Sequence, residues 1–307
     1  MPSWIKNLQK WYKHDSQQMG KFTEYSEPYE QNPIRVMIVL LSQKWHNTLL
    51  AKSKNLSIIW EIFISLLEPP REYSMLRTTI TLVAKKQLTP DVFELTYSCP
   101  DMIKEPPKAG QYVMFQLAPG LNRAYSIAII RETDFTLIIK RIAEGRWSPI
   151  ICDAEVGTAF NAMIPLGHFT LRDTPRSKCF IWTGTGFAPV YCQMLATSIS
   201  ANKPNRAIFI FWVRHFEDYF YESEIETIGK NFSEFQYIQY YSREENFEHT
   251  SKNHESRKWY VTDWITENNV GNYEEYYLCW SPAMVKSSRE KLESLWIKKE
   301  DIFWEQF

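Results

Sequence analysis

The chain has 307 residues, of which 44% are hydrophobic, and this length suits two domains plus an extension. A formal net charge of −1 gives no overall field that would attract nucleic acid, so a nucleic-acid-binding protein is disfavoured. The five cysteines form no CxxC pair and the histidines no metal-ligand pattern, so neither a zinc nor an iron–sulfur site is predicted. The odd cysteine count and the lack of a signal peptide predict a cytoplasmic protein, and no apolar run approaches the roughly 20 residues of a spanning helix.

Residues 1–72 are predicted to form a helical extension. Four apolar residues between Trp4 and Trp11 recur at helical spacing beside lysines, and a second apolar segment runs from Leu56 to Leu67. Two interpretations stay open for these helices. They pack on the chain's own body, or they dock on a membrane surface or a partner protein, as basic amphipathic helices with tryptophan do.

Residues 73–173 have the pattern of a small antiparallel barrel or sandwich. Short runs rich in β-branched and aromatic residues alternate there with turn residues at fairly even spacing. The predicted strands are Thr78–Val83, Val92–Tyr97, Gln111–Leu117, Tyr125–Ile130 and Phe135–Ile142.

Residues 174–307 change to alternating strands and helices, which predicts a doubly wound parallel sheet. The predicted strands are Cys179–Trp182, Ala207–Val213, Phe235–Tyr241 and Tyr276–Cys279. The predicted helices run through Ala196, from Tyr221 to Ile228 and from Pro282 to Trp296.

A glycine-rich turn follows the first strand of this sheet and opens a helix. Glycines let the backbone approach a pyrophosphate, and the free N–H groups and dipole of the helix favour its charge. Tight turns also need glycine for steric reasons, and the third glycine of the usual dinucleotide fingerprint is absent, so both interpretations stay open. The candidate cofactor-binding residues of the turn are Thr183, Gly184, Thr185, Gly186, Ala188 and Pro189.

The barrel part carries groups that suit a flavin nucleotide. Arg123 can clamp a phosphate, Tyr125 can lie against an isoalloxazine ring, and the Ser126 hydroxyl can hydrogen-bond a flavin edge. Taken singly, such an arginine is more often solvent-exposed, and such a tyrosine and serine are more often ordinary strand residues with no ligand. The candidate cofactor-binding residues here are Arg123, Ala124, Tyr125, Ser126, Lys140, Gly145, Arg146, Trp147 and Ser148.

In this order, the motifs of residues 75–307 resemble the ferredoxin–NADP reductase family, which includes the reductase components of oxygenases and desaturases. The matching elements are Ala109–Val113, Arg123–Ser126, Gly145–Ser148, Pro165–Phe169, Gly184–Pro189, Tyr277–Cys279 and Phe303–Phe307. The resemblance implies an antiparallel β-barrel that binds FAD, followed by an α/β domain that binds NADPH or NADH. These two domains correspond to the segments 73–173 and 174–307 that the sequence pattern separates.

The resemblance also implies roles for single residues. Arg123 binds the FAD diphosphate, Tyr125 packs on the flavin and Ser126 lies near its reactive nitrogen. Gly145 and Ser148 present a helix start to the diphosphate. The implied catalytic residues are Ser126, Cys279, Glu305 and Phe307, the last covering the flavin until nicotinamide displaces it. For Phe307 the alternative is a terminal aromatic tucked into the core.

Preference for NADPH is expected from positive charge near the adenosine 2′-phosphate. The residues assigned to this end are Arg214, Ser242, Arg243, Lys258 and Tyr260, and a solvated charged loop is the alternative. One departure from the family pattern is Trp280, which follows Cys279 where the family places a glycine. Two interpretations stay open for this large ring: it crowds or gates the approach of the nicotinamide, or it faces away and only packs.

The predicted function is an FAD-dependent oxidoreductase that takes hydride from NAD(P)H and passes single electrons to an iron–sulfur protein such as ferredoxin, or to flavodoxin. One alternative is a flavin or ferric reductase, or a diaphorase, acting on small acceptors. The other is a flavin-bearing docking subunit of a membrane-associated redox complex, attached peripherally through residues 1–72.

Overall fold

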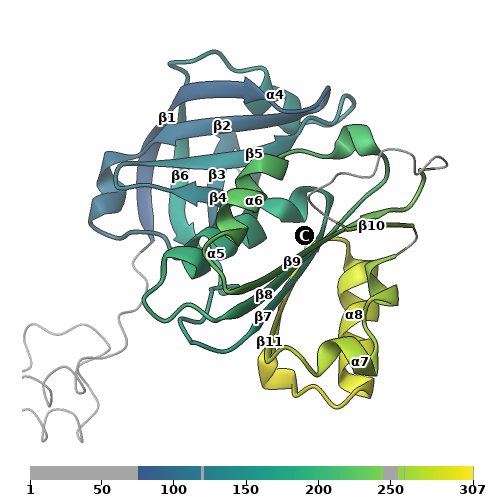
Figure 1. Ribbon diagram of the computed structural model, residues 1–307. Coiled ribbons are helices and arrows are strands. Elements are labelled where there is room, and N and C mark those ends of the chain that lie inside the picture. Colours follow the sequence, from purple (N-terminus) through teal and green to yellow (C-terminus); the bar gives the residue numbers. More distant parts are fainter. Residues whose placement is uncertain (1–74, 119–120, 245–254, 259, 307) are drawn as a thin grey trace, which may run out of the picture. The chain divides into compact units, whose positions relative to one another are not determined.

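The structure is a computed structural model that describes residues 75–118, 121–244, 255–258 and 260–306 (Figure 1). These residues belong to one compact unit, Tyr73–Phe307. The helices predicted for residues 1–72 lie outside the described residues. Within the described ranges, no helix has both the length and the apolar character needed to span a membrane.

The first half of the unit is a closed barrel of six antiparallel strands in the order β1-β2-β5-β4-β3-β6 (Figure 1). Its interior is filled by aromatic and branched side chains, with the Tyr97 ring stacked on Phe135 at 5.8 Å and edge-on to Phe115 at 5.3 Å. The strands are β1 (Leu76–Gln87), β2 (Val92–Ser98), β3 (Tyr112–Ala118), β4 (Leu121–Ile130), β5 (Asp134–Lys140) and β6 (Ala159–Leu166). Two short helices, η3 (Pro100–Ile103) and α4 (Ser148–Cys152), complete it.

The second half is a six-stranded parallel sheet in the order β10-β9-β8-β7-β11-β12. The chain builds outward from β7 to β10 and then returns to the other side of β7 with β11 and β12. The strand order therefore reverses between β7 and β11. The strands are β7 (Lys178–Thr183), β8 (Arg206–Val213), β9 (Glu234–Tyr241), β10 (Glu255–Lys258), β11 (Glu275–Cys279) and β12 (Ile302–Glu305).

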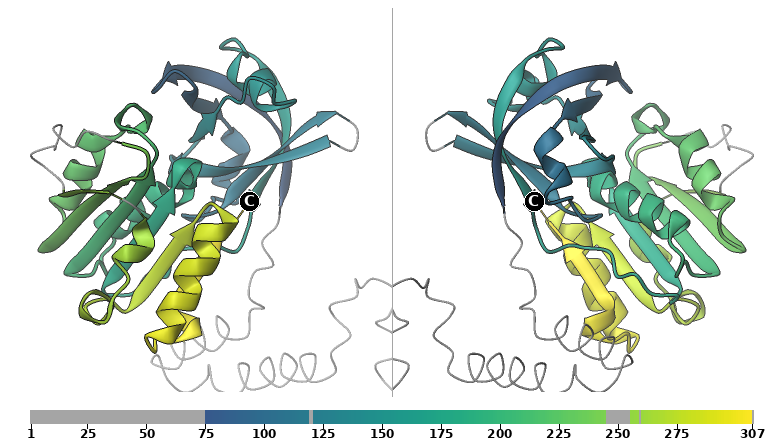
Figure 2. Two further views of the ribbon diagram at one scale, coloured as in Figure 1. Left: turned by 90° about the vertical axis from the view of Figure 1, so that its right-hand side faces the viewer. Right: turned by 90° about the vertical axis from the view of Figure 1, so that its left-hand side faces the viewer.

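Helices cover both faces of this sheet because alternate strand residues are apolar on both sides. Phe180 and Trp182 point to the face covered by α5 (Phe187–Ile199) and α6 (Glu222–Gly229). Cys179 and Ile181 point to the face covered by α7 (Glu267–Val270) and α8 (Pro282–Ser294). The side views show the long yellow helix α8 lying along the sheet (Figure 2). Short turns of helix join them: η4 (Gly184–Gly186), η5 (Phe216–Asp218), η6 (Val261–Asp263) and η7 (Lys299–Asp301).

Helix α5 lies between the sheet and the barrel. Its buried residues share one core cluster with Phe209 and Phe211 of the sheet and with Ala128 and Ile138 of the barrel. This shared core fixes the two halves against each other. The predicted order, a β-barrel followed by an α/β parallel sheet, is confirmed.

A buried ion pair joins β7 and β11 at their amino ends. Lys178 Nζ lies 2.9 Å from Glu275 Oε2, and both side chains are fully buried. The Tyr277 and Thr174 hydroxyls also donate to the Glu275 carboxylate, at 3.0 and 2.7 Å. The Lys178 ammonium donates further to the Thr174 and Arg176 carbonyls. The network thereby ties the segment between barrel and sheet to the sheet itself.

Candidate functional site

The reversal of strand order between β7 and β11 is where open α/β sheets bind ligands, at the carboxyl ends of the strands. The glycine-rich turn leaves β7 at this point and opens α5 at Phe187. Gly184 has a φ of +49°, a conformation that glycine adopts without steric cost. Thr183 is buried, and its Oγ1 has no hydrogen-bond partner among the described residues.

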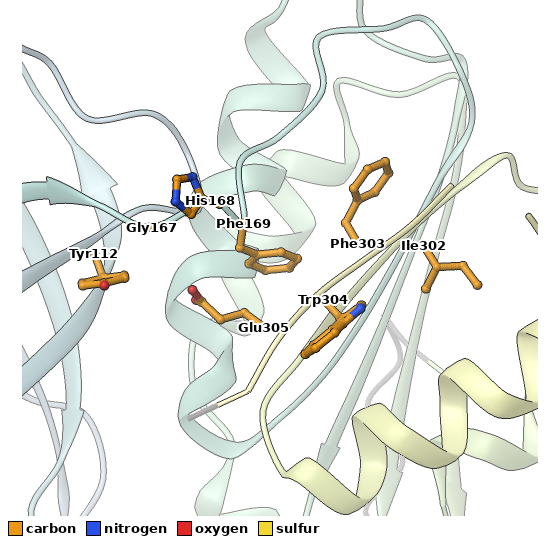
Figure 3. Close-up of a pocket in the computed structure, with 8 residues that line it drawn as sticks. All are labelled: Tyr112, Gly167, His168, Phe169, Ile302, Phe303, Trp304 and Glu305. Carbon is orange, nitrogen blue, oxygen red and sulfur yellow. The ribbon is translucent and has the colours of Figure 1, made fainter. Parts of the chain in front are cut away.

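A cavity of about 420 Å³ opens between the barrel and the edge strand β12 (Figure 3). Its walls come from the start of β3, from the segment that follows β6, and from β12. The lining residues are Tyr112, Gly167, His168, Phe169, Ile302, Phe303, Trp304 and Glu305. Most of this lining is aromatic, and aromatic walls suit a flat ring system.

Glu305 supplies the carboxyl group of this cavity. Figure 3 shows its side chain reaching from β12 toward Gly167 and the barrel. Glu305 Oε2 is buried and has no hydrogen-bond partner within the described ranges, and burial raises the pKa of this carboxyl to about 7. Glu305 is in register with Cys279 on β11. Burial raises the pKa of the Cys279 thiol well above its ordinary value, and the nearby Glu305 carboxylate raises it further, so this cysteine is an uncharged neighbour.

The barrel side of the site comes from β4. Ser126 is in register with Tyr112, a residue of the cavity wall, and its buried Oγ lacks a partner among the residues that the structure describes. Tyr125 is half-buried and lies edge-on to Phe115 of the barrel core at 5.7 Å. Burial raises the pKa of Tyr125 to about 12, so the phenol stays neutral. Ala124 is exposed.

Two arginines meet around one indole at the end of the barrel. The guanidinium carbon of Arg123 lies 5.3 Å from the ring centre of Trp147, and that of Arg146 lies 5.8 Å from it. Ser148 Oγ accepts the Ile142 N–H at 2.9 Å, which closes the loop that holds them. The last predicted residue of this group, Lys140, pairs with Asp91 at 2.7 Å on the surface.

Gly145 occupies the crowded centre of this loop. A methyl group added there would come within 2.9 Å of the Ile142 carbonyl oxygen and 3.1 Å of Ser148 Oγ. The predicted residues of motif 145–148 thus form one compact turn at the start of α4.

The residues assigned to the adenosine end also come together, at the carboxyl ends of β8 and β9. The Arg243 N–H donates to the Arg214 carbonyl at 3.0 Å, and the side chains of both residues are exposed. Ser242 precedes Arg243, and Tyr260 packs edge-on to Trp212 of β8 at 5.1 Å. Lys258 ends β10 in register with Tyr241 of β9.

One predicted site residue lies outside the described residues, and several residues of the cavity were not predicted. Phe307 lies outside the described residues. The cavity residues Tyr112, His168, Phe169 and Phe303 were not assigned a role, although three of them belong to quoted motifs of the barrel. Within the described ranges, no cluster of three or more His, Cys, Asp or Glu could hold a metal ion.

Comparison with known proteins gives the same architecture. Residues 180–290 match the family model of the oxidoreductase NAD-binding domain. The terephthalate 1,2-dioxygenase reductase component 2 of Comamonas sp is 26% identical over 240 residues, which are 73% of this chain and 69% of that protein. The chain spans about two thirds of the length of the curated relatives it matches first.

Two solved structures share the fold at low sequence identity. The cytochrome P450 reductase GcoB of Amycolatopsis is similar with a TM-score of 0.64 and 22% identity, over 76% of this chain and 71% of that one. A ferredoxin NADP⁺ reductase from Neisseria gonorrhoeae, solved with bound FAD and NADP, has a TM-score of 0.61 at 16% identity, over 75% of this chain and 98% of that one.

Proposed function

Because the chain belongs to the ferredoxin–NADP reductase-like family, we propose that it is an FAD-dependent enzyme that takes a hydride from NAD(P)H and passes electrons singly to an iron–sulfur protein. The observation that carries this proposal is the aromatic cavity between the two halves of the unit, beside which the buried polar atoms of Ser126 and Glu305 have no partner among the described residues. A buried polar atom without a partner is costly, and a ligand that hydrogen-bonds it removes the cost.

The residues present fit FAD. Ser126 Oγ, which has no partner in the described part of the chain, can hydrogen-bond a ligand next to the cavity wall, and Arg123 and Arg146 offer two positive charges at the edge of the barrel for a diphosphate. When bound, the flavin supplies chemistry that accepts a hydride and releases electrons one at a time. The protein contributes position, the exclusion of water and the charges around the ring.

The second half of the unit fits the nicotinamide nucleotide. Its diphosphate would lie at the turn after β7, where Thr183 Oγ1 has no partner among the described residues. The adenosine end would lie over the carboxyl ends of β8 and β9, where Arg214 and Arg243 favour the 2′-phosphate of NADPH. On this assignment the nicotinamide would lie near Cys279 and Glu305.

An iron–sulfur protein is the proposed acceptor. The relatives include reductase components of a dioxygenase and of propane 2-monooxygenases, which supports a partner protein more than a small acceptor. We retain ferredoxin, with flavodoxin as a second candidate. A docking role for residues 1–72, on a membrane surface or a partner, and domain limits at 73–173 and 174–307 belong to the same proposal.

The proposed function is tested by anaerobic reduction. We expect the purified chain to be yellow and to bleach on addition of NADPH. We expect rapid reduction of cytochrome c only when a ferredoxin is also added, since the acceptor is a one-electron protein. A chain without bound flavin, or one that NADPH and NADH both leave oxidised, would contradict the proposal. Equal cytochrome c reduction without ferredoxin would favour a diaphorase.

Removal of one arginine tests the NADPH preference. Replacing Arg243 with alanine should weaken NADPH binding about tenfold and leave NADH binding nearly unchanged, because a charge-assisted hydrogen bond to the 2′-phosphate contributes about 1.5–3 kcal/mol in favourable sites. Lys203→Ala is the control, since this exposed lysine lies before β8, at the opposite end of the sheet. An unchanged ratio of NADPH to NADH affinity in Arg243→Ala would refute the assignment.

A further inference from the structure

The backbone at the end of β11 has an unusual conformation. Trp280 has a φ of +71° and Ser281 a φ of +53°, so two consecutive residues with side chains occupy left-handed conformations. Such conformations are uncommon for bulky residues and cost roughly 1–3 kcal/mol each, so they persist only where the surroundings impose them. Strain of this kind concentrates at functional sites, and this one lies at the reversal of strand order between β7 and β11.

The indole of Trp280 lies directly on the glycine-rich turn. A methyl group added to Gly184 would be 3.2 Å from Trp280 Nε1 and 3.3 Å from its Cδ1. A methyl group added to Gly186 would be only 2.3 Å from Trp280 Cβ and 2.8 Å from the Cys279 carbonyl oxygen. The open side that the two glycines leave on the turn is therefore filled by the tryptophan.

This packing conflicts with the binding of a dinucleotide. A pyrophosphate approaches such a turn over its glycines, at the start of the helix that follows. The indole lies against Gly184 at this same turn. The ring and a fully seated nicotinamide half cannot both use that space.

We propose that Trp280 is a gate on the nicotinamide nucleotide: the indole that lies against Gly184 must turn away before the diphosphate and nicotinamide are seated. The gate is linked to the cavity through the backbone. The Trp280 backbone N–H donates to the Glu305 carbonyl at 3.2 Å, and Glu305 belongs to the strand that forms one cavity wall. On the other side of Trp280, Ser281 Oγ accepts the Met284 N–H at 3.3 Å and caps α8, which fixes the backbone next to Trp280. The inference rests on the proposed function and extends it.

The gate predicts tighter binding when the indole is removed. A site that is open only one tenth of the time shows a dissociation constant about tenfold weaker than its intrinsic value. The Trp280→Gly variant of the full chain, which also accepts the positive φ, should bind NADP⁺ and NAD⁺ about tenfold more tightly than the wild type. Trp280→Phe should lie between the two. The measurement is calorimetric titration.

Two controls separate a gate from other effects. Trp296→Gly removes an indole that is 93% exposed and also sits at positive φ, +65°, on the turn after α8, so it should leave nucleotide binding unchanged. Adenosine 2′,5′-bisphosphate and adenosine 5′-monophosphate occupy only the adenosine end. Their binding should therefore be the same in the wild type and in Trp280→Gly.

The outcomes are distinct. Tighter binding of NADP⁺ or NAD⁺ in Trp280→Gly, with unchanged binding of the adenosine fragments, supports the gate. Unchanged or weaker binding of the full nucleotides in that variant overturns it and leaves the proposed function intact, because the wild type still binds them. A wild-type chain that binds neither full nucleotide overturns both proposals.

Discussion

Replacing Lys178 with methionine should lower the free energy of unfolding by about 3–5 kcal/mol, because it leaves the Glu275 carboxylate buried without its counter-charge. The remaining donors of Glu275 are the hydroxyls of Thr174 and Tyr277, which are neutral. Arg176 lies 3.6 Å away, half-exposed, and is already bonded to Asp301 at 2.6 Å. None of these groups replaces a buried ammonium. Urea denaturation followed by circular dichroism measures the loss.

A second substitution distinguishes the lost pairing from lost volume. Lys178→Met combined with Glu275→Leu should recover most of the stability, since an apolar pair of similar size removes the uncompensated charge. Arg206→Met is the matched control: Arg206 pairs with Glu234 at the amino ends of β8 and β9, but both side chains are partly exposed to solvent, and the cost should be below about 1 kcal/mol. A double variant less stable than Lys178→Met alone would contradict this account.

The local sequence pattern was sufficient to predict most of the strands and helices. The five barrel runs predicted from β-branched and aromatic content overlap β1 to β5, because such residues are enriched in strands whose side chains pack in a core. Three strands were not predicted. β6 (Ala159–Leu166) contains Asn161 and Pro165, β10 (Glu255–Lys258) is entirely polar, and β12 (Ile302–Glu305) has four residues. These strands form because neighbouring strands supply hydrogen bonds, which local sequence does not report.

The predicted helix from Pro282 to Trp296 ends two residues early for a related reason. Trp296 takes a positive φ, and the Ile297 N–H donates back to the Leu292 carbonyl at 3.2 Å, which closes the last turn. A tryptophan is not the residue that sequence rules expect at such a position.

The candidate site also has features that could be predicted from the sequence and features that could not. Motifs that combine a strand end with a turn, such as Gly184–Gly186 and Ser242–Arg243, could be predicted because parallel strands align their carboxyl ends. The cavity could not. It depends on how the barrel meets the edge strand, and that arrangement follows from α5 packing against the barrel and against the central strands of the sheet. The position of Trp280 over the turn depends on the φ values of Trp280 and Ser281, for which sequence gives no signal.

Glu305 should make the stability of the chain fall as the pH rises. Its native pKa of about 7 exceeds the ordinary 4.5, so between these values the native state holds a proton that the unfolded chain has released. This contribution is fully present below pH 4.5 and is lost as the pH passes about 7. One pKa unit corresponds to about 1.4 kcal/mol, so the loss approaches about 3 kcal/mol, less what solvent screening removes from a side chain that is not fully buried.

The variant Glu305→Gln isolates this effect, because glutamine keeps the shape of the neutral carboxyl and does not titrate. The two chains should be about equally stable near pH 4.5, and the variant should be more stable by about 2–3 kcal/mol at pH 8. Glu300→Gln, a change of an exposed side chain after α8, serves as the control for losing a surface carboxylate. A stability difference between Glu305→Gln and the wild type that stays constant from pH 4.5 to 8 would refute the raised native-state pKa of Glu305.

The same titration should appear in the chemistry of the cavity. An ionised Glu305 repels the negative charge that a ring system acquires on accepting a hydride, and a neutral one does not. The rate of flavin reduction by NADPH in the wild type should therefore fall as the pH rises through about 7, and the rate in Glu305→Gln should stay level. A bound ring that excludes water from the cavity raises the pKa of the carboxyl further, so the midpoint should lie higher in the flavin-loaded chain than in the flavin-free one. Stopped-flow reduction and urea denaturation across the same pH series measure the two midpoints independently.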